Sequence, residues 1–79
     1  SIYPNPAKED LTLILNKITG KNIDVTIVNS IGQEVLGQRI TNDKEQLMHT
    51  VSIGSLSSGV YVVTVRADSK VYSERIIKL

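Results

Sequence analysis

The residues that could do chemistry in this 79-residue chain are few and widely spaced. His49 is the single histidine, and the chain has no cysteine, whereas a zinc site needs three or four ligands. No serine and aspartate stand at a recognisable catalytic-triad spacing from it. Because Leu47 and Val51 alternate in phase with His49, we expect this histidine to have a structural role at the edge of a strand.

The acidic and serine residues also lack a catalytic or metal-binding pattern. Six of the eight acidic residues group as Glu9 with Asp10, Asp43 with Glu45, and Asp68 with Glu74. None of these groups has the spacing of a calcium-binding loop, and exposed acids are the ordinary case. The serines beside Gly59 do not form the G-x-S-x-G turn of a hydrolase. We therefore expect no enzyme, no metal site and no cofactor.

Charge and hydropathy exclude several classes of partner. Nine Lys and Arg residues oppose eight Asp and Glu residues, and both signs are scattered, so no basic stripe for nucleic acid is expected. No segment approaches the roughly 20 apolar residues of a membrane span. The first residues lack the apolar run of a signal peptide, and there is no initiating Met. We expect one domain, residues 1–79, cut from a longer protein.

Composition favours an all-β fold. Ten isoleucines and nine valines stand against two alanines, and β-branched side chains suit a pleated sheet. Apolar alternation and turn residues predict strands within 10–17, 24–30, 34–40, 47–53, 59–67 and 71–79, with a short one before Pro4. This spacing predicts a small antiparallel β-sandwich of about seven strands, paired mostly with sequence neighbours.

Several residues have a predicted place in this sandwich. Gly32 suits the left-handed position of a hairpin loop, and Leu56 is expected to close one end of the core. Val60 and Val62, with Ile76 or Ile77, place apolar side chains where an outer face should be. These side chains are either covered by loops or form a surface for a partner, and the sequence leaves both readings open.

The order of four segments resembles a known family. The segments are YPNPA at 3–7, VTIVNSIGQEV at 25–35, LSSGVYVVTV at 56–65 and the closing RIIKL at 75–79. Together they resemble the type A C-terminal sorting domain of the type IX secretion system, also called the Por secretion system, over essentially the whole chain. The resemblance implies an immunoglobulin-like β-sandwich of seven strands.

The same resemblance implies a non-catalytic secretion signal. Such a domain follows a cargo that reaches the periplasm by the general export route, and it directs that cargo to the outer-membrane translocon. A sortase-like cysteine peptidase commonly removes the domain, and the cargo is often attached to lipopolysaccharide. The expected location of the cargo is therefore outside the cell or on its surface.

The family motifs assign roles to particular residues. Those matching structural motifs are Pro4, Asn5, Pro6, Gly32, Leu56, Gly59 and Tyr61. The first three are expected to shape the start of the first strand, and Gly59 to supply a backbone shape that a Cβ would hinder.

The closing motif is the part of the chain expected to be recognised by the secretion machinery. Its residues are Ile76, Ile77, Lys78 and Leu79, and Leu79 departs from the family pattern by following the frequent terminal lysine. A closing strand can offer backbone hydrogen bonds at a sheet edge while alternate side chains fill pockets of a partner. We hypothesise instead that the apolar end enters the mouth of a barrel-shaped outer-membrane carrier, where Ile77 and Leu79 meet an apolar wall. Lys78 would then meet an acidic group of the same carrier.

Two other functions fit the same fold class. A carbohydrate-binding or adhesive module would need an exposed aromatic platform, and this chain has three tyrosines but no Trp or Phe. A structural spacer would need nothing beyond the sandwich itself. We expect sorting rather than either of these.

Overall fold

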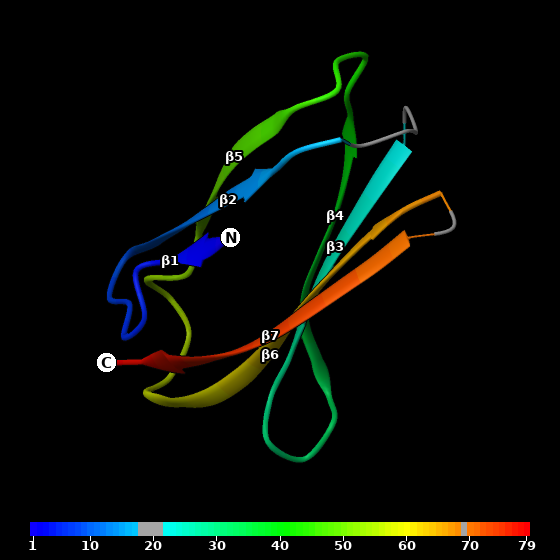
Figure 1. The fold of residues 1–79 in the computed structure, drawn as a ribbon. Helices are drawn as coiled ribbons and strands as arrows, with labels where there is room; N and C mark the ends of the chain where they lie inside the picture. The colour runs from blue at the N-terminus through cyan, green and yellow to red at the C-terminus, as the bar shows by residue number, and fades with distance from the viewer. Residues whose placement is uncertain (18–21, 69) are drawn as a thin grey trace.

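The computed structural model describes residues 1–17, 22–68 and 70–79, and over these residues the fold is all-β (Figure 1). Its strands are β1 (Ile2–Tyr3), β2 (Asp10–Leu15), β3 (Asn22–Val28), β4 (Glu34–Thr41), β5 (Leu47–Ser52), β6 (Gly59–Ala67) and β7 (Lys70–Lys78). They form two antiparallel sheets, in the orders β1-β2-β5 and β4-β3-β6-β7. The prediction of a small all-β sandwich is confirmed. No helix in the described part of the chain is long and apolar enough to cross a membrane.

The core lies between the two sheets and follows directly from apolar alternation. In β2, Leu11, Leu13 and Leu15 are buried, while the residues between them are only half-buried. The same alternation buries one face of β3 and one face of β6. Burying each such side chain contributes about 1.5–3 kcal/mol. Since the chain has no cysteine, no disulfide adds to the stability that this packing provides.

Three of the five strand pairs in the described residues join sequence neighbours, so the expectation of mostly neighbouring pairs is confirmed, but the other two pairs are not local. The described neighbours β1–β2, β3–β4 and β6–β7 do pair, but β2 also pairs with β5, and β3 pairs with β6. The polar loop 42–46 carries the chain from one sheet to the other, and 53–58 carries it back. These crossovers let each sheet bury its apolar face against the other. Turn residues act locally and do not predict which strands pair as a result.

The corner between β5 and β6 is held by Tyr61. Its ring is buried, and its hydroxyl donates a hydrogen bond of 2.6 Å to the carbonyl of Ser57, four residues upstream. This matches the tyrosine corner of immunoglobulin-like sandwiches, in which a tyrosine at the start of a strand bonds back to the preceding turn. Leu56 is half-buried in the same corner and packs against the core.

Candidate recognition surface at the last strand

The N-terminal motif and the closing motif meet along the edge of β7. The Asn5 side-chain amide donates to the Arg75 carbonyl at 3.1 Å, and its oxygen accepts from the Ile77 amide at 2.9 Å. Ala7 continues this pairing, because its amide donates to the Ile77 carbonyl and its carbonyl accepts from the Leu79 amide, each at 2.8 Å. Segments about 70 residues apart in the sequence thus form one hydrogen-bonded unit. Asn5 was expected only to shape the first strand.

Alternation along β7 divides the four expected recognition residues into two pairs. Ile76 is fully buried and Lys78 is 8% exposed, so both point into the sandwich. Ile77 and Leu79 are 43% and 56% exposed. The Lys78 ammonium donates to the Leu79 carbonyl at 2.7 Å. A contact between Lys78 and an acidic group of a carrier would therefore require this side chain to leave its inward position.

The exposed pair extends an apolar patch on the outer face of the four-stranded sheet. Val60 lies opposite Ile77 in the register and is 41% exposed, while Val28 lies opposite Val62 and both are half-buried. Leu79 follows Ile77 in the same phase. We call the residues Val28, Val60, Val62, Ile77 and Leu79 the outer patch. Of the two readings left open by the sequence, an exposed apolar surface is the one observed.

Charged groups occupy the rest of this outer face. Arg75 lies opposite Val62 and borders the outer patch. Toward the other end, Arg39 Nε lies 2.9 Å from Asp24 Oδ1 in an exposed ion pair. The hydrogen bond from Arg39, with the positive charges of Arg39 and Arg66, lowers the pKa of Asp24. The outer face therefore has an apolar end, beside the last residues of β7, and a charged end.

The glycines of the family motifs adopt conformations that other residues rarely take. Gly32 has φ +84° and its amide donates to the Asn29 carbonyl at 3.0 Å, closing the β3–β4 hairpin as predicted. Gly59 has φ +155° where β6 begins, opposite Lys78. A Cβ at either glycine would meet no atom within 4 Å, so backbone conformation rather than space favours glycine. Pro4 and Pro6 each follow a cis peptide bond.

The remaining polar residues give no catalytic centre in the described part of the chain. His49 is half-buried, and its Nε2 lies 3.2 Å from Gln38 Oε1, which joins β5 to β4 across the two sheets. Among the residues described, no three His, Cys, Asp or Glu side chains are placed to hold a metal ion. Every buried side-chain polar atom described has a hydrogen-bond partner.

The tyrosines do not form the platform that a carbohydrate-binding module would need. Tyr61 is buried, and Tyr72 is half-buried against the core. Tyr3 is the exposed member, on the other sheet. The aromatic rings of the described residues therefore do not line one exposed surface.

These features define a class of protein, an immunoglobulin-like β-sandwich with an exposed apolar patch beside its last strand. Residues 1–79 match the family described as the secretion system C-terminal sorting domain, so this chain belongs to the sorting domains of the type IX secretion system.

A longer protein contains a similar segment. The chain is 34% identical over 77 residues to the ulvan lyase NLR42 of Nonlabens ulvanivorans, an alignment that covers 96% of this chain and 14% of the lyase. The chain thus spans only a small part of the length of that relative. No solved structure matches the chain.

Two features of the site were not found from the sequence. The Tyr61 hydroxyl bond could have been anticipated, because a tyrosine opening a strand after a crossing turn is the signal of a tyrosine corner. The bonds of Asn5 had no local signal, because their partners lie about 70 residues away.

Proposed function

We propose that residues 1–79 act as a non-catalytic secretion signal, or address, at the C-terminal end of a larger secreted protein. We propose further that the outer patch is the surface that the translocon recognises. Family membership supports the sorting role. The observation that carries the proposal is the pairing of Asn5 and Ala7 with β7, which holds Ile77 and Leu79 exposed beside Val60.

Each residue of the closing motif has a separate role in this proposal. Ile77 and Leu79 contact an apolar wall of a barrel-shaped carrier in the outer membrane, because both are exposed and apolar. Ile76 anchors the strand in the core. Lys78 holds the strand end from the inner side through its bond to the Leu79 carbonyl. Recognition then needs a folded domain, since burial of Ile76 and Lys78 sets the orientation of the other two.

Membership of the sorting-domain family supports a proposal for the fate of the cargo. We propose passage through the periplasm, removal of the domain by a sortase-like cysteine peptidase, and release or surface attachment of the cargo. A segment similar to this chain makes up 14% of a lyase, which supports a secreted enzyme as the cargo class.

A passenger fusion tests the address. An inert periplasmic protein fused to residues 1–79 should appear outside a cell with a working type IX apparatus, and should stay in the periplasm when the apparatus is disabled. Replacing Ile77 and Leu79 together by Asp should retain the passenger in the periplasm, because charged side chains cannot enter an apolar wall without loss of solvation.

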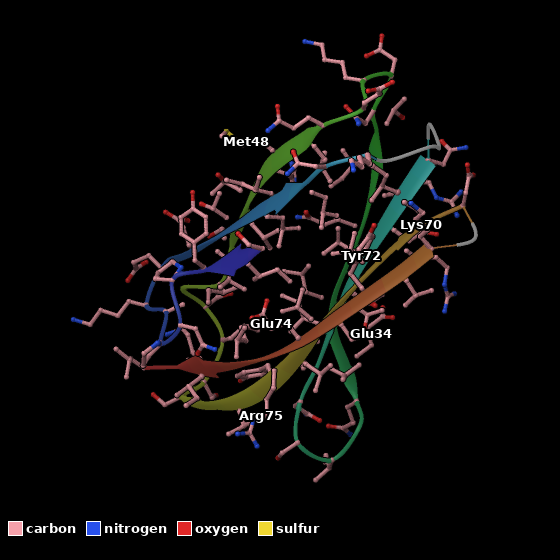
Figure 2. The ribbon with its side chains drawn as sticks, in the orientation of Figure 1. Glu34, Met48, Lys70, Tyr72, Glu74 and Arg75 are labelled. Atoms are coloured by element: carbon pink, nitrogen blue, oxygen red, sulfur yellow. The ribbon has the colours of Figure 1, made fainter. Side chains whose placement is uncertain are left out.

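The matched control is Met48→Asp. Met48 is an apolar residue 69% exposed on β5 of the other sheet, and Figure 2 shows it at the far side of the molecule from Arg75. This variant should be secreted like the parent. Secretion of the double variant at the parent level, with both variants folded by circular dichroism, would reject the outer patch as the address.

A further inference from the structure

The edge of β7 is covered along only part of its length. β7 is an outermost strand of its sheet, and Asn5 and Ala7 occupy the edge beside Arg75, Ile77 and Leu79. In an antiparallel pair, backbone groups of alternate residues point to the same side of the strand.

The uncovered part of this edge begins earlier in β7. The amides and carbonyls of Val71 and Ser73 point to the same side as those of Ile77 and Leu79, because they share the same alternation. No backbone hydrogen bond is formed there within the described residues. An edge of this kind is a template for another strand unless it is blocked.

A hollow opens beside the uncovered edge. Its volume is about 360 Å³, and its lining residues are Ser1, Ile2, Leu15, Val71, Tyr72, Ser73 and Glu74. It lies between the first strand of one sheet and the last strand of the other. Figure 2 shows Tyr72 and Glu74 directed from β7 toward the side of β1, whereas Arg75 points away. A strand added at this edge would place every second side chain in the hollow.

The lining of the hollow combines apolar surface with one acidic group. Ile2 and Leu15 are core residues, and Tyr72 packs against the core. Glu74 is exposed, and among the described residues the ion pair is formed by Arg39 and Asp24, away from this hollow. A carboxylate at the mouth of an apolar hollow favours a partner segment in which a Lys or Arg lies close to apolar residues.

We propose that the edge of β7 from Val71 to Arg75 binds an extended segment of a partner protein by strand addition, and that this segment carries a Lys or Arg two residues away from an apolar side chain. The unpaired backbone groups supply the hydrogen bonds, the hollow takes the apolar side chain, and Glu74 pairs with the basic one. This site is separate from the outer patch and does not depend on the sorting role.

A second copy of this chain fits the same edge less well. Two β7 strands could meet edge to edge, but each carries its own Asn5–Ala7 segment on that edge. The segment of one copy would then lie where the other copy must pair. Ala7 itself forms a parallel bridge with Lys78, so this strand already accepts an added segment along its covered half.

Peptide titration followed by NMR tests the site. The probe is a seven-residue capped peptide of alternating threonine and valine in which the central valine is replaced by lysine. We expect shifts in the amides of Val71, Ser73 and Arg75 and slower hydrogen exchange there. A version of the probe with N-methylated backbone amides should produce neither effect, because it cannot donate to the edge.

Two variants separate the backbone part of the site from its charge. Ser73→Pro removes an edge donor and should weaken binding by at least about tenfold, since proline is tolerated at sheet edges but cannot pair. Glu74→Gln should weaken binding of the lysine probe about two- to fivefold, the range of an exposed ion pair, without affecting a glutamine-centred probe. Met48→Asp, which changes an exposed residue of β5 in the other sheet, is the matched control and should bind normally.

Three outcomes would overturn the inference. The first is the absence of shifts at the edge of β7, and the second is equal binding by Ser73→Pro. The third is concentration-dependent shifts at Val71 and Ser73 without any peptide, which would assign the edge to a second copy of the chain. None of these results would alter the outcome of the passenger fusion, so the two proposals fail separately.

Discussion

At the scale of single residues, Tyr61 illustrates how one side chain serves both the core and a loop. Its ring lies between the sheets, and its hydroxyl bonds to the Ser57 carbonyl in the corner that leads into β6. Gly59 lies between these two residues with φ +155°. Because β6 pairs with β7 over its whole length, a well-fixed corner also fixes the position of the last strand.

Tyr61→Phe should lower the free energy of unfolding by about 0.5–1.5 kcal/mol, the net value of one hydrogen bond, because the ring stays buried while the bond is lost. Urea unfolding followed by circular dichroism measures this change. Tyr3→Phe is the control and should have almost no effect, since Tyr3 is exposed. An unchanged urea midpoint for Tyr61→Phe would show that the hydrogen bond from Tyr61 to Ser57 does not contribute to stability.

At the scale of elements, the end of β7 depends on a segment that belongs to no long strand. Asn5 imitates a strand residue with its side chain, since its amide group donates to one β7 residue and accepts from another. The following Ala7 does the same with its backbone. The exposed position of Ile77 and Leu79 is therefore set by a contact with the first residues of the chain.

Asn5→Ala should accelerate hydrogen exchange at the Ile77 amide, which loses its acceptor, while amides of the β3–β6 ladder keep their protection. Exchange followed by NMR gives both rates in one experiment. Asn42→Ala is the matched control, because the Asn42 amide bonds to the Lys44 carbonyl at 2.8 Å within a loop. If Ile77 exchanges equally fast in both variants, Asn5 does not hold the strand end.

At the scale of the whole molecule, a thin core and the proposed recognition surface share one strand. A chain of this length buries only about 60% of the surface that it exposes when unfolded, so each core residue matters. Ile76 and Ile77 are adjacent, yet Ile76 is fully buried and Ile77 is 43% exposed. The fold and the proposed recognition can therefore be separated by changing neighbouring residues.

Ile76→Ala should reduce the free energy of unfolding by about 2–5 kcal/mol, the range for truncating a core isoleucine. Ile77→Ala should change it by less than about 1 kcal/mol, because surface substitutions have small effects. Chemical denaturation of both variants measures the difference. Comparable losses would mean that the outer patch is part of the folded core rather than a free surface.

The sequence by itself indicated the strands and the hairpin turn at Gly32, because alternation and turn residues act over a few positions. It placed Leu11, Leu13, Val51 and Val63 within predicted strands, and it predicted the conformation of Gly32. The order of four segments also indicated the sorting-domain family, which the family comparison confirmed.

Only the tertiary structure decided which strands lie side by side and which residues of the closing motif are accessible. The pairing of β2 with β5 and of β3 with β6 depends on how two sheets cover one core. The bonds from Asn5 to Arg75 and Ile77 arise from that packing, as does the hollow beside Glu74. The physical reason is that local patterns fix the face of a strand, whereas closing one shared core fixes its neighbours.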